Sequence, residues 1–391
     1  MDKKRLLEDE IRSFIKDHEG DDLRQLMLQK DKYAHLPLRD IIEQISARKK
    51  AGKKLPSWYK TSGILYPTGV SIEQSSSEIT AQYKANLFAG NSGLDLTGGF
   101  GVDSYYLAKR FDKFCYVEKN KELAQIAQHN FTCLQQDNIE VKALSAEDFL
   151  SRNKQNYDLI YIDPDRRPED KRVSGFKESK PEILSFLTEL LQMSANILVK
   201  ASPMMDISLG VNELNFVKMV IVLAVDNEVK ELLFWLGRKK TKVKIRCVNL
   251  GREGEDVLDY IAEESGSCQY ARLAKYLYEP NAAIMKAGVH ALVCKKFGLN
   301  KLHPNTHLYT SEKLLENFPG RKFQVVAEES YNKRKISALL HTAKANISVR
   351  NFPDTPEQVK KKLRLKDGGE QYLFGFRNLD NELRIAICEK L

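Results

Sequence analysis

The spacing of apolar residues changes along the chain and predicts two kinds of regular structure. Residues 5–15, 21–33 and 37–50 carry apolar side chains three or four positions apart, which is typical of amphipathic helices. From Gly93 onward, short apolar runs alternate with helical stretches, and this alternation indicates a parallel sheet with right-handed crossovers. The chain is therefore expected to begin with a helical region and to continue into an α/β domain.

A second pattern predicts how the parallel sheet ends. Two strongly apolar runs, 217–225 and 229–237, are separated by only three residues, and a further strand is expected at 242–250. Strands joined by so short a turn pair as an antiparallel hairpin. After Glu279 and Pro280 the pattern changes again, to a helix over 282–299, strands at 307–311 and 322–329, and a last small α/β segment.

Length and composition narrow the class of protein. A chain of 391 residues with 42% hydrophobic residues fits a soluble protein of several domains. Its longest strongly apolar run, Met219–Val225, is far shorter than a membrane-spanning helix, and its first residues are charged. Six cysteines without a Cys-x-x-Cys pair favour reduced thiols and a cytoplasmic protein without structural zinc. His303 and His307 flank Pro304 in a predicted turn, so no metal site is expected there either.

The net charge of +9 is unevenly distributed. Residues 331–391 hold thirteen Lys and Arg against seven Asp and Glu, so most of the excess lies in this tail. A basic tail suits a polyanionic partner, although it also fits a merely solubilising surface. Six cations lie within 48–60, close to Trp58 and Tyr59, and this composition suits nucleic acid or a solvated helix end equally well.

A glycine-rich segment, Leu94–Ser104, follows the first predicted strand and begins a helix. Ser104 stands where a dinucleotide fingerprint has its third glycine, and no Gly-Lys-Ser/Thr follows, which excludes a Walker A loop. An acid at the strand end, Asp95, followed by glycines resembles motif I of S-adenosylmethionine (SAM) methyltransferases. A carboxylate there suits the cationic amino group of SAM and would repel a pyrophosphate. The cofactor residues expected here are Asp95, Thr97, Gly98, Gly99, Phe100 and Gly101.

Further cofactor contacts are expected from three other segments. Glu118 ends the second strand and can accept hydrogen bonds from ribose hydroxyls, in SAM and NAD alike. After the third strand, Ser145 falls where an adenine-binding Asp is common, and nearby groups can replace it. Upstream, Ser75 and Glu78 fit a helix capping box, or the segment closes over the cofactor. The expected cofactor residues in these segments are Gln74, Ser75, Glu118, Ala146, Glu147 and Asp148.

Together, the segments 73–85, 94–104, 162–167, 199–204, 227–233 and 347–363 resemble bacterial class I SAM-dependent methyltransferases with a ferredoxin-like domain and a C-terminal THUMP-like domain. The resemblance implies a Rossmann-like α/β sheet with a terminal antiparallel hairpin, and small α+β C-terminal domains. We expect a helical region at 1–88, the methyltransferase domain at 89–272, the ferredoxin-like domain at 273–327 and the THUMP-like domain at 328–391. It also implies SAM as cofactor and a nucleic-acid partner, most simply RNA.

The segment after the fourth strand is the expected methyl-acceptor site, formed by Asp163, Pro164, Asp165, Arg166 and Arg167. Amino-directed methyltransferases use Asp/Asn-Pro-Pro-aromatic at this point. Here Asp165 replaces the second Pro and Arg166 replaces the aromatic ring, which puts base-amine methylation in doubt. Alternatively, the arginines pair with neighbouring acids and only fix the loop. A covalent uracil-C5 mechanism is not expected, because no cysteine follows the next strand.

The function expected from the sequence is a SAM-dependent methyltransferase that acts on RNA, without metal or membrane association. Two alternatives stay open. One is a catalytically inactive RNA-binding protein that keeps the fold, and the other is a methyltransferase for a small-molecule or protein substrate.

Overall fold

The structure is a computed structural model that describes residues 3–67, 72–166, 175–252 and 254–391. Two compact units divide the chain. The first comprises residues 1–218 and 232–241, and the second comprises residues 219–231 and 242–391.

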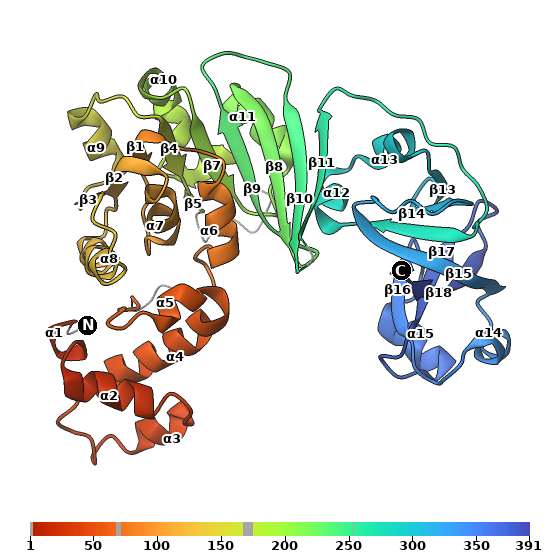
Figure 1. Ribbon diagram of the computed structural model, residues 1–391, viewed down its shortest axis with the longest axis horizontal. Helices are drawn as coiled ribbons and strands as arrows, with labels where there is room; N and C mark the ends of the chain where they lie inside the picture. Colours follow the sequence, from red (N-terminus) through yellow and green to blue (C-terminus); the bar gives the residue numbers. More distant parts are fainter. Residues whose placement is uncertain (1–2, 68–71, 167–174, 253) are drawn as a thin grey trace. The chain divides into compact units, whose positions relative to one another are not determined.

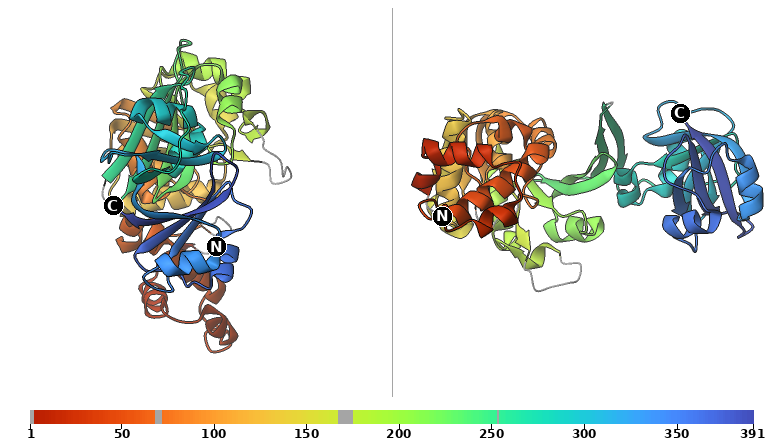
Figure 2. Two further views of the ribbon diagram at one scale, coloured as in Figure 1. Left: turned by 90° about the vertical axis from the view of Figure 1, so that its right-hand side faces the viewer. Right: turned by 90° about the horizontal axis from the view of Figure 1, so that it is seen from below.

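The N-terminal region is helical, as the spacing of apolar residues predicts, and the first of its helices, red in Figure 2, lie together. Its helices are α1 (Lys3–Leu6), α2 (Asp9–Asp17), α3 (Leu23–Leu28), α4 (Leu38–Lys54), α5 (Pro56–Lys60) and α6 (Glu78–Ala85). Trp58 on α5 is fully buried against Phe100 and Tyr105, with ring centroids 4.9 and 5.7 Å away. The indole therefore belongs to the core and cannot serve as an exposed stacking surface for a base.

A nine-stranded sheet follows, in the order β11-β10-β8-β9-β7-β4-β1-β2-β3 (Figure 1). Its strands are β1 (Gly90–Asp95), β2 (Phe111–Val117), β3 (Ile139–Lys142), β4 (Leu159–Ile162), β7 (Ile197–Ala201), β8 (Val217–Val225), β9 (Glu228–Leu236), β10 (Lys244–Gly251) and β11 (Gly254–Ile261). The five strands β3, β2, β1, β4 and β7 are parallel, because each connection crosses back over the sheet. The carboxyl ends of these strands consequently meet at one edge, where open α/β sheets bind ligands.

Helices connect the parallel strands, namely α7 (Val102–Ala108), α8 (Lys121–Cys133), α9 (Ala146–Arg152), α10 (Ile183–Met193) and α11 (Ile207–Leu214). Between β4 and α10 lie the short strands β5 (Asp165–Arg166) and β6 (Ser179–Lys180), which pair antiparallel, and the 3₁₀ helix η1 (Phe176–Glu178).

The predicted terminal hairpin is confirmed. Strand β9 runs antiparallel to β7, and a two-residue turn joins it to β8. Asp226 and Asn227 both have positive φ, 49° and 63°. Asp and Asn adopt this left-handed conformation more readily than most residues, and positive φ at both central positions is the hairpin turn that matches strand twist. Strand β11 has no counterpart among the sequence predictions.

The second unit contains a seven-stranded sheet in the order β13-β14-β12-β15-β18-β17-β16. Its elements are β12 (Tyr276–Pro280), α12 (Ala282–Ala287), α13 (His290–Phe297), β13 (Asn300–His303), β14 (Thr306–Ser311), β15 (Gly320–Ser330), α14 (Lys333–Leu339), β16 (Asn346–Arg350), α15 (Pro356–Leu363), β17 (Gln371–Arg377) and β18 (Leu383–Lys390). Strand β12 pairs antiparallel with both β14 and β15, so one continuous sheet spans this part of the chain.

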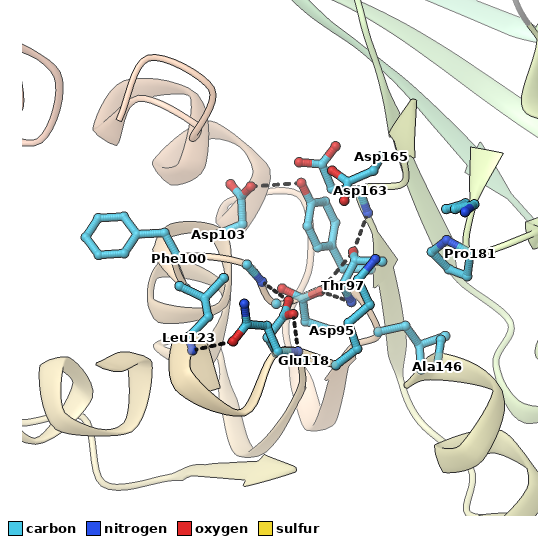
Figure 3. Close-up of a pocket in the computed structure, with 18 of the residues that line it drawn as sticks. Asp95, Thr97, Phe100, Asp103, Glu118, Leu123, Ala146, Asp163, Asp165 and Pro181 are labelled. Atoms are coloured by element: carbon cyan, nitrogen blue, oxygen red, sulfur yellow. Dashed lines mark hydrogen bonds between the residues drawn. The ribbon is translucent and has the colours of Figure 1, made fainter. Parts of the chain in front are cut away.

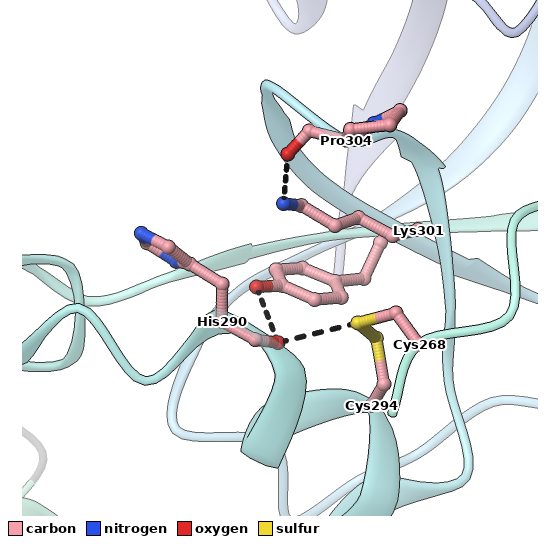
Figure 4. The surroundings of a disulfide bond; sticks show 6 residues. Cys268, His290, Cys294, Lys301 and Pro304 are labelled. Carbon is pink, nitrogen blue, oxygen red and sulfur yellow. Dashed lines mark hydrogen bonds between the residues drawn. A yellow bond between two sulfur atoms is a disulfide. The ribbon is translucent and has the colours of Figure 1, made fainter. Parts of the chain in front are cut away.

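Two predictions for this unit are wrong in detail. The helix predicted over 282–299 is broken into α12 and α13 at Gly288, whose φ of 71° ends α12 in a left-handed cap. The six cysteines are not all free thiols, because Cys268 and Cys294 form a disulfide beside the backbone carbonyl of His290 (Figure 4). The fold brings together two cysteines that lie 26 residues apart in the sequence.

Candidate functional site

A cavity of about 660 Å³ lies at the carboxyl ends of β1, β2 and β4 (Figure 3). Most of the residues predicted to bind a cofactor or an acceptor line it. They are Gln74, Ser75, Asp95, Thr97, Gly98, Gly99, Phe100, Gly101, Glu118, Ala146, Glu147, Asp163 and Asp165. Asp148 and Pro164 do not line this cavity. The side chain of Arg166 and the whole of Arg167 lie outside what the structure describes.

The loop between β1 and α7 needs its glycines for steric reasons. A Cβ atom on Gly98 would lie 2.1 Å from the ring of Tyr116, and one on Gly101, whose φ is 90°, would lie 2.8 Å from Phe131. Tyr116 also donates a hydrogen bond from its hydroxyl to the carbonyl of Gly99, at 2.6 Å. The loop therefore fits closely over β2, and its backbone is exposed to whatever occupies the cavity.

Asp95, at the end of β1, is almost fully buried and lies at the base of this loop. Its carboxylate accepts hydrogen bonds from the backbone N–H of Thr97 (2.9 Å) and from the hydroxyl of Ser104 (2.5 Å). Burial raises the pKa of Asp95 to about 7, although these two hydrogen bonds act to lower it. A cationic group arriving in the cavity would favour the ionised form of this carboxyl.

Glu118 reaches the same loop from the end of β2. Its carboxylate accepts hydrogen bonds from the backbone N–H groups of Gly99 (3.0 Å) and Asn120 (2.7 Å). A carboxylate oxygen has two lone pairs, so Glu118 keeps acceptor capacity for the hydroxyls of a ligand. Asn120 caps α8, and both residues line the cavity.

The segment that precedes α6 is fastened to the start of α7 by a buried charge pair. Lys84 is completely buried, and its ammonium lies 3.0 Å from both Asp103 Oδ1 and Ser76 Oγ. Asp103 Oδ2 accepts hydrogen bonds from the hydroxyls of Ser76 (2.7 Å) and Tyr161 (2.9 Å). Ser76, Asp103 and Tyr161 all line the cavity, so this network joins three of its walls.

The protonation state of Asp103 follows from its surroundings. Burial alone would raise the pKa of Asp103, but the ammonium groups of Lys84 and Lys200 lower it below its ordinary value. The carboxylate is therefore ionised at neutral pH, and the pair is a true ion pair inside the protein.

Two predictions about the N-terminal ends of α6 and α9 are wrong in detail. The predicted capping box of Ser75 and Glu78 is wrong, because Ser77 caps α6 and Glu78 instead accepts a hydrogen bond from the backbone N–H of Ser57, at 2.9 Å. Ser145 caps α9 and bonds to Asp148, which keeps Asp148 turned to the helix, while Ala146 and Glu147 face the cavity.

Asp163 follows β4, on the far side of the cavity from Glu118 (Figure 3). Its backbone N–H donates to Thr97 Oγ1 at 2.6 Å, and its Oδ2 accepts from the ammonium of Lys200 at 2.5 Å. Lys200 comes from β7 and is mostly buried, with 13% of its side chain exposed. Lys200 thus fixes one carboxylate oxygen of Asp163. About a third of the Asp163 side chain stays exposed, and the residue lines the cavity.

Several lining residues were not predicted from the sequence. Ser76, Asp103 and Tyr161 form the buried network, and Lys180, Pro181 and Glu182 arrive through the pairing of β5 with β6. Asp103 stands two residues after the last glycine of the loop, and Lys200 stands at the end of the strand next to β4. Both positions lie close to predicted site residues, so the sequence could have indicated them. Nothing in the spacing of residues 180–182 indicates that they return to this cavity.

Within the described part of the chain, no cluster of His, Cys, Asp or Glu could hold a metal ion. Among these same described residues, no helix is both long and apolar enough to cross a bilayer.

Comparisons with known proteins agree with the fold. Residues 276–319 match the model of a ferredoxin-like domain family, and residues 320–390 match that of a THUMP-like domain family. A crystal structure from Porphyromonas gingivalis W83, assigned by name to the methyltransferases, is 31% identical, has a TM-score of 0.88 and covers 100% of this chain and 99% of its own.

Two curated relatives extend the comparison. A Mycobacterium tuberculosis protein named an uncharacterized SAM-dependent methyltransferase is 22% identical over 83% of this chain and 89% of its own length. A tRNA/tmRNA (uracil-C5)-methyltransferase of Aliivibrio fischeri is 32% identical, over only 27% of this chain and 35% of its own length.

The buried pair makes a prediction for stability. Lys84→Met should lower the free energy of unfolding by about 3–5 kcal/mol at pH 7, because it leaves the ionised Asp103 buried without its main counter-charge. Lys84→Met combined with Asp103→Leu should recover most of this loss, since no charge is then left unpaired. Urea unfolding of both variants measures the effect, and a Lys84→Met protein as stable as the wild type would contradict it.

Proposed function

The chain belongs to a family of bacterial class I SAM-dependent methyltransferases with ferredoxin-like and THUMP-like domains, and from this premise we propose that it methylates a nucleobase of RNA. The observation that carries the proposal is one cavity in which the glycine loop and Asp163 face a common space. A methyl donor held by the loop would then lie beside an acceptor held at Asp163.

SAM supplies an electrophilic methyl group on a sulfonium sulfur. In this proposal, Asp95 receives the ammonium of the cofactor, and Glu118 accepts hydrogen bonds from its ribose hydroxyls. Ala146 and Glu147 flank the adenine, and Gln74 and Ser75 cover the cofactor from the side of α6. The fastening of Ser76 to Asp103 holds this cover in place.

On the acceptor side, Asp163 is proposed to orient the acceptor and to take its proton. Lys200 and the backbone contact to Thr97 fix the direction of the Asp163 side chain. All six cysteines lie in the described part of the chain, and none lines the cavity. A covalent route through a cysteine thiolate, which uracil-C5 transfer requires, therefore finds no nucleophile, and the proposed acceptor is a nitrogen or oxygen atom.

The choice of RNA rests on the C-terminal domain. Six exposed cations there form no ion pair within the described residues, and they are Lys333, Arg334, Lys344, Lys361, Arg364 and Lys366. Unpaired cations on one domain attract phosphates, whatever the RNA sequence. The name of the partial relative from A. fischeri, a tRNA/tmRNA methyltransferase, supports the same substrate class.

Transfer of a labelled methyl group tests the function. Purified protein, SAM labelled on the methyl group and total RNA from a strain that lacks the gene should yield one labelled methylated nucleoside after digestion. Asp163→Ala should lower transfer by at least a hundredfold while the affinity for S-adenosylhomocysteine stays nearly unchanged, because a group that acts on the acceptor contributes mainly in the transition state.

The controls separate the alternatives. Asp112 is an exposed acid on β2, and the control variant Asp112→Ala should keep full activity. Label in protein or in a small molecule instead of RNA would identify another substrate class, and no transfer with intact RNA binding would identify an inactive binding protein. Full activity of a folded Asp163→Ala variant would remove Asp163 from the acceptor site.

The raised pKa of Asp95 predicts how cofactor affinity depends on pH. With a pKa of about 7, the carboxyl is mostly protonated at pH 6 and mostly ionised at pH 8. If the ionised form receives the ligand's ammonium, S-adenosylhomocysteine should bind about tenfold more tightly at pH 8 than at pH 6. Calorimetry on the wild type and on Asp95→Asn measures this, and the variant should lose the dependence. Equal wild-type affinity at both pH values would contradict the proposed contact.

A further inference from the structure

A second cavity, of about 450 Å³, lies in the N-terminal helical region. Helices α2, α4 and α5 line it together with the loop 61–65, and the proposed methyl-transfer site uses none of its residues. Four cations line this cavity, namely Arg12, Lys16, Arg48 and Lys60, and Asp9 is the one acid among its described lining residues.

Three of these cations have weak partners or none. Arg12 meets Asp9 Oδ1 at 3.4 Å, but the Asp9 side chain is 99% exposed, so water screens this pair. The second terminal nitrogen of Arg12, Nη2, donates a hydrogen bond to the hydroxyl of Ser62. Lys16 and Lys60 are exposed and form no ion pair in the described part of the chain. The charge on this wall is therefore largely uncompensated.

Arg48 gives the most specific indication of a ligand. Four-fifths of its side chain is buried, and it forms an ion pair with the partly buried Glu19, whose Oε1 lies 3.9 Å from Nε. This distance is too long for a hydrogen bond, so the buried Nε–H has no hydrogen-bond partner, while Nη2 donates to the carbonyl of Tyr59 at 3.5 Å. Its guanidinium is placed against the ring of Tyr59, with 5.1 Å between Cζ and the ring centroid. A buried donor without an acceptor is unfavourable, and an anionic ligand in the cavity would supply that acceptor.

The cavity is held in shape by contacts to neighbouring elements. Gly63 O lies 2.8 Å from His129 Nε2, and the side chain of Asn130 forms hydrogen bonds with both backbone groups of Leu65, at 2.8 and 2.9 Å. His129 and Asn130 belong to α8, whose cap Asn120 lines the first cavity. The loop 61–65 is thus fixed before any ligand arrives, which lowers the entropic cost of binding.

We propose that this second cavity binds a phosphate group of the RNA substrate, a proposal that rests on the proposed function. Guanidinium groups can hold phosphate oxygens with paired N–H donors, and the hydroxyl of Ser62 adds a neutral donor. Tyr59 is the aromatic residue among the described residues that line the cavity, but the guanidinium of Arg48 already lies over its ring, and the neighbouring Trp58 is buried in the core. The chemistry of the cavity therefore selects the phosphodiester backbone and not a base, so it contributes affinity without sequence preference.

The test compares two double variants that remove the same charges. Arg12→Gln with Lys60→Gln removes one Arg and one Lys from the cavity. Arg24→Gln with Lys53→Gln removes one Arg and one Lys from exposed positions on α3 and α4 outside the cavity. Fluorescence anisotropy with a labelled RNA that the wild type binds should show roughly tenfold weaker binding for the cavity variant. Its plot of log K against log salt should also be flatter, by about 0.7 per lost phosphate contact on single-stranded RNA.

The outcomes separate this proposal from the proposed function. Weaker binding and a flatter slope for the cavity variant alone, with unchanged affinity for S-adenosylhomocysteine, support the phosphate site. If the wild type binds RNA and the two double variants lose affinity equally, or not at all, the cavity proposal is overturned and the proposed function stands. A wild-type protein that binds no RNA would overturn both.

Discussion

The buried ion pair between Lys84 and Asp103 is the interaction on which the cavity at the ends of β1, β2 and β4 depends. Burying two charges is unfavourable unless they meet with good geometry and their remaining hydrogen-bonding capacity is used. Here Ser76 and Tyr161 complete the shell around the carboxylate, and the four residues come from α6 and its preceding segment, from α7 and from β4. A structural requirement, the neutralisation of one buried carboxylate, thus fixes the relative positions of three cavity walls.

Thr97 connects two parts of the site in a similar way. Its backbone N–H donates to Asp95 and its hydroxyl accepts from the backbone of Asp163, so one residue connects the proposed cofactor side to the proposed acceptor side. Class I motifs commonly have glycine at this place in the loop, and glycine could not supply the second contact. The departure from the pattern therefore adds a link between the two halves of the site.

Much of the first unit could be predicted from the sequence because its signals are local. Alternating strands and helices indicate a parallel sheet, and the ends of such strands must meet, so the sequence alone assigns Asp95, Glu118 and Asp163 to one site. The fully buried Lys84 could not be identified in this way. A lysine on an amphipathic helix ordinarily faces water, and only the tertiary position of Asp103 explains its burial. The Cys268–Cys294 disulfide and residues 180–182 were missed for the same reason, since each depends on contacts between distant segments.

Strand pairing in the second unit has a consequence for protein synthesis. The ferredoxin-like match ends at residue 319 and the THUMP-like match begins at 320, yet β12 of the former pairs directly with β15 of the latter. The two families therefore describe separate sequence segments but a single hydrogen-bonded sheet. A growing chain that has reached residue 319 holds β12 with one edge unpaired, and open strand edges promote aggregation. This edge closes only when β15 leaves the ribosome, so the two segments mature as one folding unit, and a cut between them would produce two fragments with exposed edges.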